Sequence, residues 1–170
     1  FERRNIKEIG FRNQEFKKEF ILIGCHRTGE SIAMNLPKEN LLIIDFDPDV
    51  INRLKEQGFD FIFGDISDRE VFERANFGNA RLVISTSPDL EDNLALVRNL
   101  KFFKERPKII VRAETEKETE ILYRAGADYV LLPNFTAGQY LGKTISLDPG
   151  MEILKELRRS DITLLSKIQI

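Results

Sequence analysis

The residues with the clearest potential for chemistry lie in a short turn, Gly24-Cys-His-Arg-Thr-Gly29, and at Asp45, which follows Gly24 by 21 positions. Where a helix begins at such a turn, its first backbone N–H groups are free to hold a phosphate. A carboxylate about 20 residues further on, at the end of the next strand, accepts hydrogen bonds from ribose hydroxyls. The spacing therefore predicts a nucleotide site, and the alternative is an ordinary strand–turn–helix without a ligand.

Arg112 is the second informative residue, because it places a charge at the end of the apolar segment 108–112. A buried charge is costly unless it is paired or reaches water. Two interpretations stay open. Arg112 forms a structural ion pair with an acid such as Asp89, Glu91 or Asp92, or it clamps a ligand phosphate.

Catalytic and metal-binding residues are not predicted. His26 is the single histidine and cannot build a metal site alone, so an exposed turn histidine is the alternative to a ligand contact. Cys25 is the single cysteine, and no base with an orienting group accompanies it. We therefore expect a small buried thiol rather than a nucleophile. One cysteine also excludes an internal disulfide framework and fits a reducing compartment.

Length and composition set the broad class of the protein. The 170 residues fit one domain, or one domain with extensions. With 28 acids and 26 bases the net charge is −2, and no basic face with interleaved aromatics suggests nucleic-acid binding. No apolar stretch approaches the roughly 20 residues that cross a bilayer. The chain begins at Phe1 without methionine or a signal peptide, so we expect a soluble, cytosolic piece of a longer protein.

Six short apolar segments alternate with helical patterns and are expected to position these residues. Such alternation is typical of a parallel sheet with both faces covered by helices. Right-handed crossovers then predict an α/β fold, a Rossmann-like doubly wound six-stranded sheet of order 3-2-1-4-5-6. The ligand crevice is expected at the carboxyl ends of strands 1 and 4. The expected strands are 20–23, 41–44, 59–63, 82–86, 108–112 and 129–132.

The remaining segments are assigned as helices or extensions. Residues 1–19 are expected to be a charged linker or a solvated surface helix, 20–147 the nucleotide-binding domain, and 148–170 a crossover helix with the start of a truncated C-terminal segment. Within that last segment, 149–158 is amphipathic and 161–170 is read as the start of a strand. The other expected helices run from 48 to 58, from 68 to 77, from 88 to about 105, from 116 to 125 and from 134 to about 145.

Six motifs occur in an order and spacing that resemble the RCK N-terminal domain, also called KTN or TrkA-N, over roughly residues 20–142. That family forms the cytosolic nucleotide-sensing domain of potassium channels, potassium-uptake systems and cation–proton antiporters. The resemblance implies a regulatory domain rather than an enzyme, located at the cytosolic face of the membrane. The motifs are Gly24-Cys-His-Arg-Thr-Gly29, Asp45-Phe-Asp47, Gly64-Asp-Ile-Ser-Asp68, Asp89-x-Glu-Asp-Asn-Leu94, Val111-Arg-Ala113 and Gly126-Ala-Asp-Tyr-Val130.

The same resemblance implies a nucleotide held between strands 1 and 4, and a homodimer or larger ring whose pairing gates an attached transporter or channel. The dimer surface is expected on the helix after 134 together with 149–158. The contact set is expected to be Gly24, His26, Arg27, Thr28 and Gly29 at the phosphates, Asp45 on the ribose with Phe46 beside it, Asp65 and Ile66 near the adenine, and Thr86, Ser87 and Arg112 across the crevice.

The choice among nucleotides is narrowed by His26 and by the acids Asp45 and Asp47. His26 replaces the middle glycine that lets backbone approach a pyrophosphate, and its Cβ would crowd a dinucleotide. An adenine mononucleotide, AMP first, is therefore favoured over NAD(H), with ADP and ATP also open. Asp45, with Asp47 close by, disfavours the 2′-phosphate of NADP by like-charge repulsion.

Two other functions compete with the sensor hypothesis. A fragment of an NAD-dependent oxidoreductase is the first, although 170 residues leave no room for a substrate domain. No histidine, lysine or tyrosine set follows the fourth strand where hydride chemistry would need an acid or base. A domain that has lost its ligand and only assembles is the second.

Overall fold

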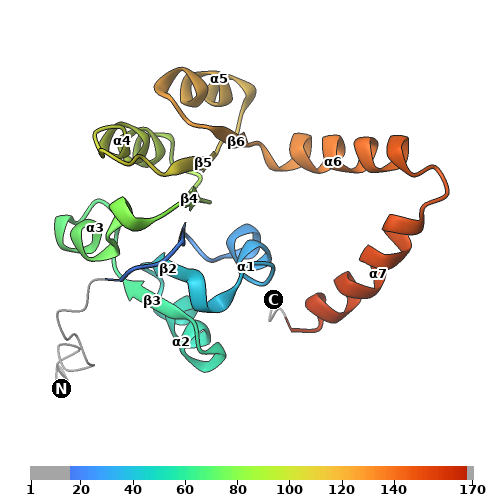
Figure 1. Ribbon diagram of the computed structural model, residues 1–170, viewed down its shortest axis with the longest axis horizontal. Coiled ribbons are helices and arrows are strands. Elements are labelled where there is room, and N and C mark those ends of the chain that lie inside the picture. The colour runs from blue at the N-terminus through green and yellow to red at the C-terminus, as the bar shows by residue number, and fades with distance from the viewer. Residues whose placement is uncertain (1–15, 168–170) are drawn as a thin grey trace.

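The computed structural model describes residues 16–167, and its centre is a six-stranded parallel sheet (Figure 1). The strand order is β3-β2-β1-β4-β5-β6, which confirms the predicted doubly wound topology. Most of the expected linker at 1–19 lies outside the described residues. The strands are β1 Phe20–Ile23, β2 Leu41–Asp45, β3 Asp60–Phe63, β4 Leu82–Ser85, β5 Lys108–Arg112 and β6 Tyr129–Leu131.

Helices cover both faces of this sheet because successive strand residues point to opposite sides. In β1, Ile21 and Ile23 pack on one side with residues of α3, α4 and α5, whereas Leu22 packs on the other with residues of α1 and α2. Each central strand therefore reads as a continuous apolar run. The helices are α1 Arg27–Ala33, α2 Pro48–Gln57, α3 Arg69–Ala75, α4 Leu90–Leu100, α5 Glu116–Ala125, α6 Pro133–Leu147 and α7 Glu152–Leu165.

Two predicted segments were wrong. The helix that opens at 88–89 ends at Leu100 rather than near 105, since Phe102 and Phe103 donate their N–H groups to carbonyls three residues back and Phe103 packs against the core. Residues 161–165 belong to α7 and do not begin a strand. The amphipathic period seen over 149–158 continues to the end of that helix, whereas the short sequence window suggested two separate elements.

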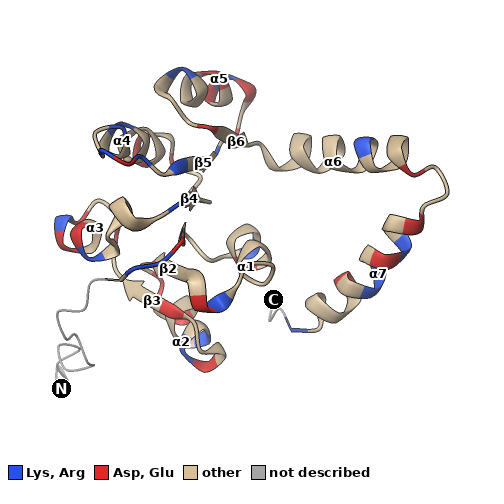
Figure 2. Ribbon diagram, in the orientation of Figure 1, with Lys and Arg blue, Asp and Glu red and all other residues tan. Residues whose placement is uncertain are grey.

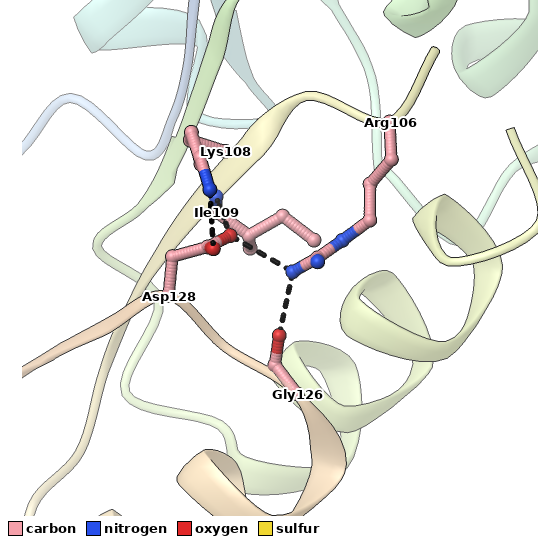
Figure 3. Close-up of polar contacts among 5 residues, drawn as sticks. All are labelled: Arg106, Lys108, Ile109, Gly126 and Asp128. Carbon is pink, nitrogen blue, oxygen red and sulfur yellow. Dashed lines mark hydrogen bonds and ion pairs between the residues drawn. The ribbon is translucent and has the colours of Figure 1, made fainter. Parts of the chain in front are cut away.

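Asp128 joins the start of β5 to the loop before β6 (Figure 3). Its Oδ2 accepts hydrogen bonds from the Ile109 N–H at 2.8 Å and from Arg106 Nη2 at 2.8 Å. Arg106 also donates to the Gly126 carbonyl at 2.7 Å, and Lys108 Nζ lies 3.3 Å from Asp128 Oδ1. The Gly126-Ala-Asp motif therefore stabilises the β5–β6 pairing at the edge of the sheet opposite the carboxyl ends of the strands.

Helices α6 and α7 form an arm that leaves the sheet after β6 and turns back toward α1 (Figure 1). Along α6 the one charged residue is Lys143, and Figure 2 shows this helix almost entirely uncharged. Several of its apolar side chains are exposed, among them Tyr140, Leu141 and Ile145. At the far end of the arm, Leu164 of α7 borders a hollow beside Phe59 and the end of α1. Within residues 16–167 no helix has the length and apolar character that crossing a membrane requires.

Candidate functional site

A cavity of about 620 Å³ opens at the carboxyl ends of β1 and β4, where the strand order reverses. This is the position at which doubly wound sheets bind ligands. Eleven of the twelve predicted contact residues line it, and Gly29 is the exception. The residues brought together are Gly24, His26, Arg27, Thr28, Asp45, Phe46, Asp65, Ile66, Thr86, Ser87 and Arg112.

The glycine turn depends on two residues without a Cβ. Gly24 has φ +82°, a left-handed conformation that favours glycine. Gly29 lies under the turn, and a Cβ placed there would stand 2.0 Å from the Gly24 carbonyl oxygen. Thr86 fixes the same carbonyl, because its hydroxyl donates to Gly24 O at 2.9 Å. Gly29 and Thr86 therefore shape the turn from below, and Thr86 also contributes to the cavity wall.

Backbone N–H groups of the turn are available to a ligand. Helix α1 begins at Arg27, with His26 as its extended N-cap, and the first intrahelical bond runs from Glu30 N to His26 O. Among the described residues, the N–H groups of Arg27, Thr28 and Gly29 have no protein acceptor. The His26 side chain is exposed and its Nε2 lies 3.6 Å from Asp47 Oδ2. The turn thus offers donors and an imidazole to an anion.

Asp45 is a buried carboxylate at the end of β2, with 4% of its surface exposed. Its Oδ2 accepts from the Cys25 N–H at 2.7 Å and its Oδ1 from the Asp47 N–H at 2.9 Å. Each carboxylate oxygen has a second lone pair, so Asp45 retains capacity for a hydroxyl donor. The acid therefore holds the turn in place and borders the cavity at once.

Cys25 is a buried thiol, as the sequence predicts. Burial is the main cause that raises its pKa to about 12, and the charges of Glu30 and Asp45 add to the shift. Because the thiolate is the reactive form, a thiol with this pKa is protonated and inert at neutral pH.

Another part of the cavity lining combines an aromatic ring, an aliphatic side chain and a carboxylate. Phe46 is 69% exposed at the rim, which is unusual for a phenylalanine, and Ile66 is half-buried. Asp65 Oδ1 accepts from both the N–H and the hydroxyl of Ser67 at 2.8 Å, which orients its carboxylate. These three residues form a surface on which a planar base can lie.

Arg112 reaches the cavity but pairs with none of the three acids that the sequence suggested. Its Nη2 lies 2.6 Å from Oε1 of Glu114, so Arg112 does form an ion pair, with Glu114 rather than with Asp89, Glu91 or Asp92. Residues two apart on extended backbone point to the same side, which brings Glu114 within reach. Asp89 instead caps α4 by accepting from the Asp92 N–H at 3.0 Å.

Asn93 is a site residue that the sequence analysis did not single out. It is fully buried, and its Nδ2 donates at 2.9 Å to the carbonyls of Ser87 and of Arg112. It therefore ties the ends of β4 and β5 together beneath the cavity. An asparagine among Leu94, Leu96 and Val97 on the buried side of a helix was the available signal, because buried polar groups need specific partners.

Asp92, which was considered from the sequence only as a partner of Arg112, lines the cavity together with Asp89. Burial is the first cause that raises the pKa of Asp92 above its usual range, and repulsion from Asp89 and Asp65 adds to it. Four acids line the cavity, Asp45, Asp65, Asp89 and Asp92, against two arginines, Arg27 and Arg112. The balance of charge around a ligand phosphate therefore depends strongly on the two arginines.

Comparison with known proteins agrees with this geometry. The family model of the TrkA-N domain matches residues 20–133. A relative described as "Probable potassium channel protein 2" of Methanocaldococcus jannaschii is 27% identical over 153 residues, which cover 86% of this chain and 44% of the relative. The chain thus spans less than half the length of that relative.

Solved structures share the fold. The NAD(P)-binding domain of an exopolyphosphatase-related protein from Archaeoglobus fulgidus is 26% identical, with a TM-score of 0.65 over 76% of this chain and 98% of that domain. The Kef CTD of Shewanella denitrificans, in an AMP bound form, is 20% identical, with a TM-score of 0.60 over 87% of this chain and 91% of that one.

Proposed function

Because this chain belongs to the TrkA-N domain family, we propose that it binds an adenine nucleotide and thereby regulates a membrane cation channel or transporter to which it is attached. The observation that carries the proposal is the single cavity that unites the glycine turn, with its free N–H groups, and the buried carboxylate of Asp45. Phosphate binds at the turn beside Arg27, the ribose hydroxyls donate to Asp45, and the base lies against Phe46 and Ile66.

AMP is the first choice of ligand, with ADP, ATP and NAD(H) following. His26 supports this order, since its Cβ narrows the approach of a pyrophosphate while its exposed imidazole can donate to a terminal phosphate. The Kef CTD, seen with AMP, supports the mononucleotide, and the NAD(P)-binding domain from A. fulgidus supports a dinucleotide in the same fold. Asp45 and Asp47 disfavour the 2′-phosphate of NADP.

In this proposal, the nucleotide regulates the attached channel or transporter by changing how two copies of the chain pair. The exposed apolar side chains of the α6–α7 arm, among them Tyr140, Leu141 and Ile145, are the proposed dimer surface. A nucleotide shifts such a pair only if it binds one arrangement more tightly than the other. The relative in M. jannaschii, a potassium channel protein by its description, supports an attached potassium pathway and a position at the cytosolic face of the membrane.

Titration calorimetry of the chain with AMP, ATP and NADH tests the proposal. Asp45→Ala is expected to weaken nucleotide binding by about 1–3 kcal/mol, the usual cost of stranding polar partners. Asp161→Ala, the same change on the exposed surface of α7, is the control and leaves affinity unchanged. Equal affinities for Asp45→Ala and the unaltered chain would remove Asp45 from the site, and steady oxidation of NADH with a carbonyl compound would favour an oxidoreductase instead.

A further inference from the structure

We propose that Glu114 is a positioning residue for Arg112, and that the pair sets how strongly the cavity discriminates between nucleotides with one phosphate and nucleotides with several. This inference rests on the proposed nucleotide function and names a regulator of the same site. Glu114 itself does not line the cavity, and it acts through the guanidinium that does.

The guanidinium of Arg112 is only partly satisfied. Its Nη2 is held 2.6 Å from Glu114 Oε1, while its buried Nε has no hydrogen-bond partner among residues 16–167. A guanidinium presents five N–H donors in a fixed fork, so a second anion in the cavity can engage donors that Glu114 leaves unused. The resting orientation is therefore one that a ligand can improve.

The backbone around the pair is fixed, so only side chains need to move. The Arg112 carbonyl accepts from Asn93 Nδ2 at 2.9 Å, and the Ala113 N–H donates to the Leu131 carbonyl at 2.9 Å. The Glu114 N–H donates to Glu118 Oε2 at 2.8 Å, at the start of α5. Ligand binding can thus turn the guanidinium without disturbing β5 or the helix that follows.

The ion pair is weak enough to be exchanged. The side chains of Arg112 and Glu114 are 26% and 45% exposed, and partly exposed pairs of this kind contribute little net free energy. A phosphate binds an arginine bidentately and more strongly than a single carboxylate oxygen. Once released, Glu114 reaches water, so the exchange carries a small penalty. A ligand with more negative charge competes better with Glu114.

Neighbouring charges make this exchange matter for selectivity. The cavity is lined by Asp45, Asp65, Asp89 and Asp92, which repel additional phosphates, and by Arg27 and Arg112, which attract them. While Glu114 holds Arg112, the net field disfavours a triphosphate. Removing the charge of Glu114 frees one of two arginines and raises affinity most for the most highly charged nucleotide.

Calorimetric titration of Glu114→Gln with ATP and with AMP tests this inference. The affinity for ATP is expected to rise about two- to fivefold, the range that exposed ion pairs supply, and the affinity for AMP is expected to rise less. Glu120→Gln is the matched control, because it removes the same charge and because Glu120 pairs with Arg124 on the exposed surface of α5, away from the cavity lining. It is expected to leave the ratio of the two affinities unchanged.

The double variant Arg112→Gln with Glu114→Gln separates a specific contact from the general field. If Glu114 acts through Arg112, its substitution has no effect once the arginine is gone. An unchanged ATP-to-AMP ratio in Glu114→Gln, or the same increase with and without Arg112, would overturn the inference while leaving nucleotide binding intact. Absence of binding by every nucleotide to the unaltered chain would instead overturn the proposed function on which it rests.

Discussion

His26 is the residue that most affects which nucleotide the site accepts, since it occupies the position where dinucleotide-binding turns carry their middle glycine. In this structure it has an ordinary extended conformation as the N-cap of α1, with φ −82°, so the backbone does not require glycine there. The side chain alone therefore decides how closely a pyrophosphate approaches. Its imidazole lies near Asp47, is 64% exposed and lines the cavity.

We expect His26→Gly to raise the affinity for NADH relative to AMP by about tenfold, equivalent to about 1.4 kcal/mol, because the Cβ no longer crowds the pyrophosphate. Competition titrations of the two ligands measure the ratio. His26→Ala keeps the Cβ but loses the imidazole, so it separates crowding from hydrogen bonding and is expected to leave NADH disfavoured. Equal ratios in His26→Gly and the unaltered chain would show that the side chain does not select the ligand.

At the scale of elements, patterns along the chain predicted most of the fold. The apolar runs of β1 to β6 and the turn residues between them are local features. Right-handed crossovers, together with the two-halves arrangement of the dinucleotide-binding fold, convert them into the strand order. Element ends were less predictable. Helix α4 stops at Leu100 because Phe103 returns to the core, a tertiary contact with no local signature.

The sequence predicted the site residues whose positions follow from backbone geometry. It did not predict which side chains pair with one another. Gly24, Gly29 and Asp45 follow from the turn and the strand end, and the structure brings Gly24 and Asp45 to one cavity with Gly29 beneath it. Arg112 pairs with Glu114, two positions further on, rather than with the acids of α4, and this choice depends on the turn that follows β5. The bridging role of Asn93 depends on which groups meet across β4, α4 and β5. A single sequence does not contain those distances.

Gly29→Ala is expected to destabilise the fold by about 1–3 kcal/mol, or more, because its Cβ would overlap the Gly24 carbonyl oxygen. Urea unfolding followed by circular dichroism measures the change. Gly138→Ala is the matched control in α6, where an added Cβ meets no atom, and helix propensity predicts a gain of roughly 0.5–1 kcal/mol. A Gly29→Ala variant as stable as the unaltered chain would show that the turn relaxes easily around the methyl group.

At the scale of the whole molecule, a sheet covered by helices on both faces contrasts with the α6–α7 arm, whose apolar side chains are exposed. Both faces of β1, β2 and β4 are covered by helices, whereas α6 exposes apolar side chains and carries one charged residue along its 15-residue length. A helix of this composition is typical of a buried or interface segment. The arm is therefore the part of the chain that a second copy is proposed to cover.

Leu141→Glu combined with Ile145→Glu is expected to convert a dimer into a monomer, since two charges would be buried at the proposed interface. Sedimentation velocity at several concentrations measures the association state. Phe102→Glu, at an exposed aromatic on the loop after α4, is the control and should leave the dimer intact. Monomeric behaviour of the unaltered chain at high concentration would exclude the arm as a self-association surface.

The central claim places an adenine nucleotide over the β1–β4 switch point, and backbone amide NMR of the ¹⁵N-labelled chain titrated with AMP tests it most directly. We predict the largest shifts at the amides of residues 26–29, with further shifts at residues 45–46 and 86–87. Shifts confined to the groove between α3 and α4, around Phe72, Ala95 and Asn99, or no shifts at saturating AMP, would contradict the claim.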